Sequence, residues 1–367
     1  MAGVYRIKQS VLDTVAKNYG NITVPSGPVL DCTLGVNPYG LPQRVRTALR
    51  EMDPGVVAHY PHDCDVIGGI AAKFAGVARL TGENVLLSCG SFDALCKLNK
   101  AVLGPNSGVM GVVPRFSAYV DDVNNIGAIH RGYPLRASDG YRFDTEEFLR
   151  RYRLYPDCPL VCVENPHNPT GQIIPLGEIE AIAAEAERNG ALLLVDEAYG
   201  EYMPEENSAV GLVSRRENVA VCRSFSKGYG MAGLRIGYLV GHPSLIGKLN
   251  NLFVPYDCNA VARRLAAAML REEGFCAGLR RRTARDKGKV LSSLTRFRAA
   301  ATAESTPILL LYVEDGDVDL HRLLLEEGLL TVSGAGFDNL GRNAVRMMVS
   351  AEPEKQAALL ERAQRRG

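Results

Sequence analysis

Reactive side chains stand where several apolar segments of this 367-residue chain end. The segment 191–198 contains Asp196, with Tyr199 just after it, and the segment 218–226 is followed directly by Lys227. A carboxylate at the end of a buried strand needs a cationic or proton-bearing partner. Lys227, set among serines and glycines in SFSKGYG, is either a solvated loop charge or a catalytic amine. The residues at the other segment ends favour the catalytic amine.

A phosphate-binding group is spread over several of these segment ends. Backbone N–H groups at a helix N-terminus attract anions, and a guanidinium can bind a phosphate through two N–H groups. The residues that offer such groups or hydroxyls are Gly90, Ser91, Phe92, Ser224, Ser226 and Arg235. Serine is also a common helix N-cap, so Ser91 alone leaves a structural explanation open.

The remaining groups suit a flat ring. Phe116, in VPRFSAY, could stack on a ring, although core packing explains a lone phenylalanine as well. Asn168, in ENPHNPTGQ, lies in a predicted tight turn and offers an amide donor. Asp196 would face a basic ring nitrogen, and Lys227 would meet an aldehyde. Together with the phosphate-binding group, these features fit one ligand, pyridoxal 5′-phosphate, whose phenolic oxygen Asn168 and Tyr199 would hold.

The elements that must position these groups are those of an α/β fold. Short apolar segments too continuous to alternate with solvent predict strands buried on both faces. These segments are 85–90, 108–114, 159–164, 191–198, 218–226 and 234–240. Amphipathic segments such as 178–190 lie between them, so we expect a mostly parallel sheet covered by helices. Ligands of such sheets bind beyond the carboxyl ends of the strands.

The C-terminal third follows another pattern. Long charged helices over 259–300, a helix at 318–327 and short apolar strands predict a smaller α+β domain. We therefore expect an N-terminal arm (1–35) that packs with this domain or reaches a partner, a large cofactor-binding domain (36–254) and a small C-terminal domain (255–367).

Composition argues against several classes of protein. Lysine and arginine (42) nearly balance aspartate and glutamate (41), so no strong field attracts nucleic acid or an anionic membrane. The sequence shows neither a signal peptide nor an apolar stretch that could span a bilayer, and we expect a cytoplasmic protein with small-molecule partners. Its nine cysteines form no CxxC pair, so we expect reduced thiols and no metal site.

The motif around the lysine resembles a known family. The pattern S-x-S-K-x-x-G-x-x-G-L-R-x-G, preceded by N-P-x-N-P-T-G and D-E-A-Y, is similar to the fold-type I pyridoxal-phosphate enzymes and, among them, to the class I/II aminotransferases. The likeness covers essentially the whole chain. LGVNPYGLP and HYP (59–61) resemble the histidinol-phosphate aminotransferases and the threonine-phosphate decarboxylases. The resemblance implies a seven-stranded, mostly parallel sheet in the large domain.

The resemblance also implies a role for each cofactor residue. Lys227 would form the internal aldimine, and Asp196 would keep the pyridine nitrogen protonated. Tyr199 and Asn168 would hold the phenolic oxygen, and Phe116 would stack on the ring. The phosphate would be held by Gly90, Ser91, Phe92, Ser224, Ser226 and Arg235, and by Tyr60 of the other subunit. The sites would therefore be shared within a homodimer.

The implied substrates are an L-amino acid and a 2-oxo acid. Arg346, in AVRMMVS, would clamp the substrate carboxylate, Asn37 would lie in a loop that closes over it, and Asn168 would contribute as well. An ion pair within the fold would also satisfy Arg346. Where histidinol-phosphate aminotransferases usually have an arginine for the substrate phosphate, this chain has Val332, which favours an unphosphorylated substrate.

None of these motifs determines which reaction the site catalyses. A site of this kind could also decarboxylate, eliminate, replace, cyclise or oxidise, because the bond that breaks depends on substrate orientation. We therefore keep a non-aminotransferase pyridoxal-phosphate enzyme as the alternative to transamination. A binding or regulatory module is disfavoured because Lys227, Asp196, Tyr199 and Arg235 are all present. Candidates for contact with the substrate side chain are Tyr5, Tyr19, Tyr39 and Arg115.

Overall fold

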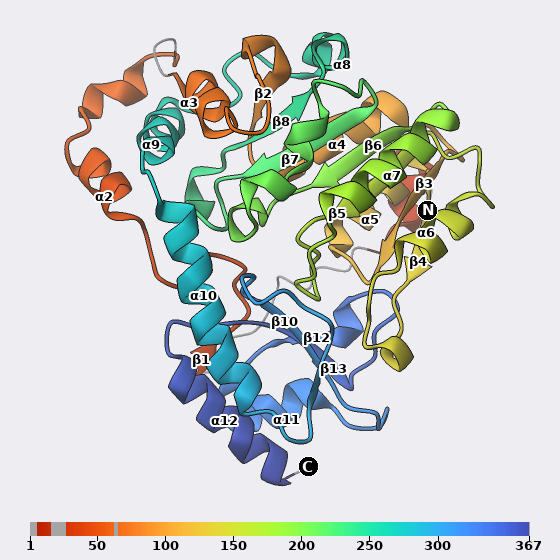
Figure 1. The fold of residues 1–367 in the computed structure, drawn as a ribbon, viewed down its shortest axis with the longest axis vertical. Helices are drawn as coiled ribbons and strands as arrows, with labels where there is room; N and C mark the ends of the chain where they lie inside the picture. The colour runs from red at the N-terminus through yellow and green to blue at the C-terminus, as the bar shows by residue number, and fades with distance from the viewer. Residues whose placement is uncertain (1–5, 16–26, 62–64, 367) are drawn as a thin grey trace.

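A seven-stranded sheet forms the centre of the upper half of the molecule in Figure 1. The computed structural model describes residues 6–15, 27–61 and 65–366. The strand order is β2-β8-β7-β6-β5-β3-β4, with β2 (Val85–Ser88), β3 (Gly108–Val113), β4 (Ile129–Pro134), β5 (Leu160–Glu164), β6 (Leu192–Asp196), β7 (Val219–Ser224) and β8 (Gly237–Gly241). Strand β8 is antiparallel to β2 and β7, and the other pairs are parallel. The expected α/β class with a mostly parallel seven-stranded sheet is confirmed.

Helices cover both faces of this sheet. Neighbouring residues of β6 point to opposite faces: Leu194 packs in one apolar core, and Leu193 and Val195 pack in the other. The first core contains α4 (Ser91–Val102), α5 (Ser117–Ile126) and α8 (Pro243–Leu249), and the second contains α6 (Thr145–Tyr152) and α7 (Leu176–Arg188). This two-sided burial is the reason why the central strands are continuous apolar runs in the sequence.

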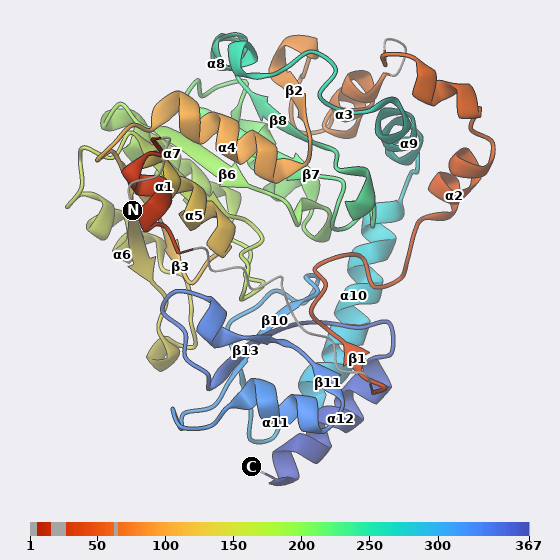
Figure 2. The same cartoon turned by 180° about the vertical axis from the view of Figure 1, so that it is seen from behind.

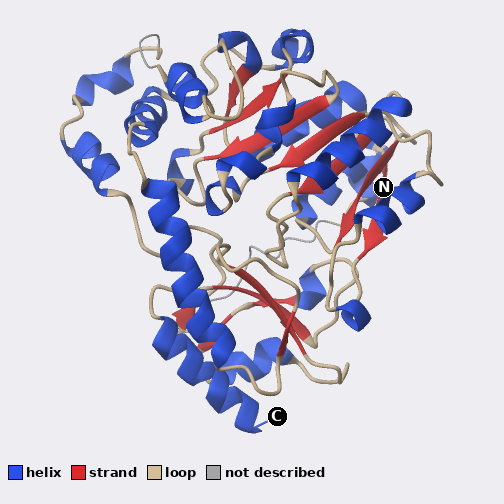
Figure 3. Ribbon diagram, in the orientation of Figure 1, coloured by secondary structure: helices blue, strands red, loops and turns tan. Residues whose placement is uncertain are grey.

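A smaller antiparallel sheet lies below the large one (Figure 3). Its order is β12-β13-β10-β9, with β9 (Arg298–Ala299), β10 (Ile308–Tyr312), β12 (Val332–Ser333) and β13 (Ala344–Met348). A separate apolar core joins it to α10 (Phe275–Ser292), α11 (Leu320–Glu326) and α12 (Pro353–Arg366). Helix α10 runs from the large sheet to the small one (Figure 1), so it connects the two halves of the molecule.

Three more helices pack against the large sheet. Helices α2 (Gln43–Arg50), α3 (Val66–Lys73) and α9 (Ala260–Leu270) pack together and contribute to its second core.

The described parts of the segment 1–35 lie in two places. Helix α1 (Gln9–Asp13) rests on α5 (Figure 2), where the Ser10 hydroxyl donates to the Asn125 carbonyl at 2.8 Å. Strand β1 (Leu30–Asp31) pairs in parallel with β11 (Leu329–Leu330), next to the small sheet.

Candidate active site

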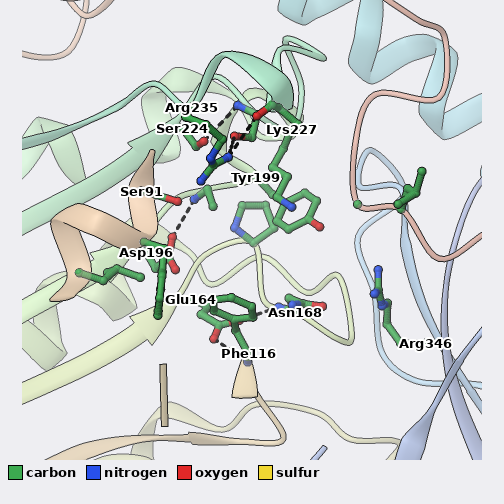
Figure 4. A pocket seen from close by; sticks show the side chains of 18 of the residues that line it. Ser91, Phe116, Glu164, Asn168, Asp196, Tyr199, Ser224, Lys227, Arg235 and Arg346 are labelled. Atoms are coloured by element: carbon green, nitrogen blue, oxygen red, sulfur yellow. Dashed lines mark hydrogen bonds between the residues drawn. The ribbon is translucent and has the colours of Figure 1, made fainter. Parts of the chain in front are cut away.

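A cavity of about 300 Å³ lies at the carboxyl ends of the central strands (Figure 4). Because β5, β6 and β7 are parallel, the residues that end or follow them meet at one edge of the sheet. The lining residues are Thr33, Leu34, Gly35, Ser91, Phe92, Leu95, Phe116, Glu164, Pro166, Asn168, Asp196, Ala198, Tyr199, Ser224, Ser226, Lys227, Ala232, Arg235 and Arg346. The cavity thus brings together all the predicted cofactor residues except Gly90 and Tyr60.

At one end of the cavity the start of α4 faces a guanidinium. Gly90, directly before the helix, has a φ of +89°, a conformation that favours glycine. A Cβ on Gly90 would lie 2.6 Å from Nη2 of Arg235, so the glycine allows the guanidinium to approach the helix. Nη1 of Arg235 donates to the hydroxyl of Ser226 at 3.4 Å. Helix N–H groups, hydroxyls and a guanidinium together make an anion site.

Lys227 follows β7 and lies over the ring of Tyr199, with Nζ 5.3 Å from the ring centre. Burial, aided by the positive charge of Arg346 and opposed by Asp196, lowers the pKa of Lys227 to about 8. More of this amine is therefore neutral near pH 7 than in an exposed lysine, which favours nucleophilic chemistry. A Cβ on Gly35 would collide with the Tyr199 hydroxyl and lie 3.2 Å from Nζ of Lys227, so a glycine keeps the space beside the amine open.

Asp196 ends β6 with a buried carboxylate. Its Oδ1 accepts a hydrogen bond from the N–H of Ala198 at 3.0 Å. Burial raises the pKa of Asp196, and the Ala198 N–H and the charges of Arg115 and Lys227 oppose this shift. A protonated ring nitrogen would be the partner that a buried carboxylate requires. Burial also raises the pKa of the Tyr199 phenol to about 12, so Tyr199 remains a hydrogen-bond donor at neutral pH.

Sequence reasoning did not single out Glu164, a second carboxylate in the cavity. It ends β5 and pairs in register with Asp196 at the end of β6. The signal that identified Asp196, an acidic residue at the end of a buried strand, also marks Glu164. Thr33, Leu34 and Gly35 were missed as well, because nothing in their side-chain chemistry distinguishes them from ordinary loop residues.

Arg346 enters the cavity from the small sheet. It lies on β13 between Leu310 of β10 and Val332 of β12, and it is 4% exposed. Figure 4 shows it on the side of the cavity away from Asp196. A guanidinium in this position can bind a carboxylate of a ligand that lies between the two sheets.

The other predicted residues that the structure describes lie outside the cavity lining. Asn37 is buried next to the lysine loop and donates to the Gly228 carbonyl at 2.8 Å. Tyr60 is 71% exposed and its ring lies 4.8 Å from that of Tyr256. Among the candidates for contact with the substrate, the Tyr39 hydroxyl donates to Asp286 and Arg115 is buried beside Glu164. Tyr5 and Tyr19 lie outside the described residues.

The cavity fits pyridoxal phosphate by the chemistry of its donor set. The anion site matches the phosphate of that molecule, and the Asp196 carboxylate matches its ring nitrogen. The Lys227 amine matches its aldehyde, and the Tyr199 phenol matches its phenolic oxygen. A side chain at Gly90 or at Gly35 would collide with residues that line the cavity. No group of three metal-ligating side chains occurs among residues 6–15, 27–61 and 65–366. Over the same ranges, every helix is too short or too polar to cross a bilayer.

Fold and site together define a pyridoxal-phosphate enzyme of the α/β type, and comparison with known proteins identifies the family. The family model for aminotransferase class I and II matches residues 28–362. The chain therefore belongs to the class I and II aminotransferases, as the lysine motif indicated, and pyridoxal phosphate is the cofactor of this family. The predictions of family, enzyme class and cofactor are confirmed.

Two curated relatives are histidinol-phosphate aminotransferases. That of Halorubrum lacusprofundi is 35% identical over 66% of this chain and 64% of its own length. A second, from Ralstonia nicotianae, is 29% identical over 87% of this chain and 83% of its own. Among solved structures, histidinol-phosphate aminotransferase from Sinorhizobium meliloti in complex with pyridoxal-5′-phosphate matches with a TM-score of 0.81 at 20% identity, over 100% of this chain and 99% of that one. That similarity establishes the fold.

Proposed function

We propose that the protein transfers an amino group between an L-amino acid and a 2-oxo acid, with pyridoxal phosphate held on Lys227. One observation carries the proposal: a lysine of lowered pKa, a buried aspartate and an anion site share one cavity with Arg346. The match to the class I and II aminotransferase family supports the same reaction. The cofactor, when bound, acts as an electron sink that acidifies the α-hydrogen of the substrate.

The chain's own residues would divide the work of binding and proton transfer. The cofactor phosphate would lie at the start of α4, among Ser224, Ser226 and Arg235. Asp196 would hold a proton on the ring nitrogen, Tyr199 and Asn168 would donate to the ring oxygen, and Phe116 would pack on the ring. Arg346 would bind the substrate carboxylate and so orient the α-hydrogen toward Nζ of Lys227, which would remove it as general base.

We further propose that the substrate is not phosphorylated. Val332, at the position where the resemblance would place a phosphate-binding arginine, is 2% exposed and lies beside Arg346 on the neighbouring strand. A buried valine offers no hydrogen bond or charge to a phosphate. Kinetic comparison of histidinol phosphate with unphosphorylated amino acids tests this proposal, and a strong preference for histidinol phosphate would contradict it.

We also propose a cytoplasmic homodimer. Tyr60 does not line the cavity of its own chain and is exposed, which suits a residue that serves the site of a second copy. Asn37 would help to close the substrate site through its bond to the lysine loop.

The absorbance of the bound cofactor tests the role of Lys227. The purified protein should bind pyridoxal phosphate with a visible absorbance band, and Lys227→Ala should abolish that band. Lys100→Ala, which removes an exposed lysine at the end of α4, is the matched control and should retain it.

The reaction is tested with a panel of amino acids. Transamination predicts loss of the visible band together with stoichiometric release of the matching 2-oxo acid, and return of the band when a second 2-oxo acid is added. Release of CO2, ammonia or peroxide in place of this exchange would instead support the alternative class of reaction.

A further inference from the structure

Glu164 and Arg115 form a buried ion pair beside the proposed cofactor site. Nε of Arg115 lies 3.3 Å from Oε1 of Glu164, and the two side chains are 2% and 5% exposed. The guanidinium also lies 3.9 Å from the centre of the Tyr119 ring, and its Nη2 contacts Sγ of Cys162 at 3.2 Å. Glu164 faces the cavity (Figure 4), so this pair separates the cavity from the core behind it.

The two carboxylate oxygens of Glu164 hold two different loops. Oε1 accepts a hydrogen bond from the N–H of Phe116 at 3.2 Å, and Oε2 accepts one from the N–H of Asn168 at 3.1 Å. Phe116 follows β3, whereas Asn168 follows β5. A single carboxylate therefore sets the position of the predicted stacking ring relative to the predicted amide donor.

Arg115 offsets the charge that Glu164 brings to the cavity. Glu164 and Asp196 are register partners on parallel strands, so their carboxylates lie on the same face of the sheet. Burial raises the pKa of Glu164 to about 7, with Arg115 as the main opposing influence.

The titratable groups around Arg115, on the core side of the pair, are neutral. His130 lies 3.4 Å from Nη1 of Arg115, and burial with this cation lowers the pKa of His130 to about 3, so it stays neutral. Burial keeps the Tyr119 phenol and the Cys162 thiol neutral by raising their pKa values. On the cavity side, Glu164 faces Asp196 and the neutral phenol of Tyr199.

We propose that Glu164 and Arg115 are positioning residues for the cofactor. Glu164 fixes Phe116 and Asn168 relative to each other, and Arg115 balances its charge so that Asp196 supplies the negative charge beside the ring nitrogen. This inference rests on the cofactor roles proposed above for Phe116, Asn168 and Asp196.

The positioning role is tested with Glu164→Asp. Aspartate keeps the charge but is one methylene shorter, so it cannot reach both N–H groups. Titration of the apoprotein with pyridoxal phosphate should show affinity roughly tenfold weaker than in the wild type, because Phe116 and Asn168 are no longer held in one relative position before the cofactor binds. The pH midpoint of the visible band should stay unchanged, since the charge is retained. Affinity equal to that of the wild type would overturn the positioning role.

The charge role is tested with Glu164→Gln. Glutamine keeps the length but leaves the Arg115 cation unbalanced beside the site. The pH midpoint of the visible band should then fall by roughly one unit, because an added positive charge disfavours the protonated form of the lysine–cofactor linkage. The double variant Arg115→Met/Glu164→Gln removes both charges and should restore the midpoint. An unchanged midpoint in Glu164→Gln would overturn the charge role.

A structural ion pair elsewhere supplies the matched control. Glu185, in α7, is buried, forms ion pairs with the exposed Arg153 and Arg188, and does not line the cavity. Glu185→Gln should lower the melting temperature without altering cofactor affinity or the midpoint. A wild-type protein that takes up no pyridoxal phosphate would contradict the proposed function itself. Wild-type uptake with unchanged Glu164 variants would instead overturn this inference alone.

Discussion

Lys227 and Arg346 reach the same cavity from different sheets, and their charges are coupled. Arg346 is the largest charge that contributes to the lowered pKa of Lys227, after burial itself. A substrate carboxylate bound to Arg346 would neutralise that charge, so binding of a substrate would raise the pKa of the amine and prepare it to accept the α-proton. The same arginine would therefore both orient the substrate and adjust the pKa of the base.

This coupling predicts the pH dependence of cofactor uptake in an arginine variant. Only the neutral amine attacks an aldehyde, so uptake by the wild-type apoprotein should slow as the pH falls below about 8, the pKa of Lys227. Arg346→Gln removes a cation, which raises that pKa and should move the midpoint of the rate profile to higher pH. Stopped-flow measurement of the visible band checks this. Arg342→Gln, an exposed arginine paired with Asp317, is the control and should leave the profile in place.

At the scale of elements, the turn that carries Asn168 is hydrogen-bonded to the loop between β9 and β10 of the small sheet. The carbonyl of Gly171 accepts hydrogen bonds from the Thr306 hydroxyl at 2.8 Å and from the Ala303 N–H at 3.0 Å. Nζ of Lys287, in α10, in turn donates to Thr302, Ala303, Thr306 and Ile308. These hydrogen bonds therefore hold the turn and the small sheet in a fixed relation next to the cavity.

Substitution of Gly171 tests this attachment. Gly171 has a φ of +80°, and a Cβ there would lie 2.6 Å from the Ile308 carbonyl oxygen and the Thr302 hydroxyl. Gly171→Ala should lower the free energy of unfolding by roughly 2 kcal/mol or more, because it adds backbone strain to a clash with backbone. Denaturant unfolding of the apoprotein measures the change.

The control for this variant is a glycine in a helix that covers the large sheet. Gly177 lies in α7, and a Cβ added to it would meet no atom within 4 Å, so Gly177→Ala should be neutral or stabilising by up to about 1 kcal/mol. Equal stability of the two variants would show that the attachment is not rigid.

The elements that the sequence predicted correctly are those whose pattern is local. Continuous apolar runs marked β2, β3, β5, β6, β7 and β8, since strands buried on both faces contain little else. Strand β4 escaped prediction because it is an edge strand, IHRGYP, with partly exposed polar residues. The site residues that could be predicted were likewise those with a local sequence pattern. Motif residues adjacent to strand ends were found, whereas the role of Glu164 depends on Arg115, a contact across distant parts of the chain that no local pattern records.

At the scale of the whole molecule, an exposed apolar region is the surface where the second copy of the proposed homodimer would bind. Val57, Tyr60, Val254 and Tyr256 all have large exposed fractions, and the rings of Tyr60 and Tyr256 pack on each other. Apolar surface of this kind fits a two-fold interface. If Tyr60 completes the site of the partner, each site contains residues from two chains.

Mixed dimers test the shared site. Tyr60→Ala and Lys227→Ala should each be nearly inactive alone, since each damages both sites of its own homodimer. A mixed dimer has one site with both lesions and one intact site, so unfolding and refolding the two variants together at equal amounts should restore roughly a quarter of wild-type activity. Mixing Lys227→Ala with Asp196→Ala is the matched control and should restore nothing, because both residues belong to the same chain's cavity. Restoration in the control, or its absence in the first mixture, would contradict a Tyr60 that serves the opposite subunit.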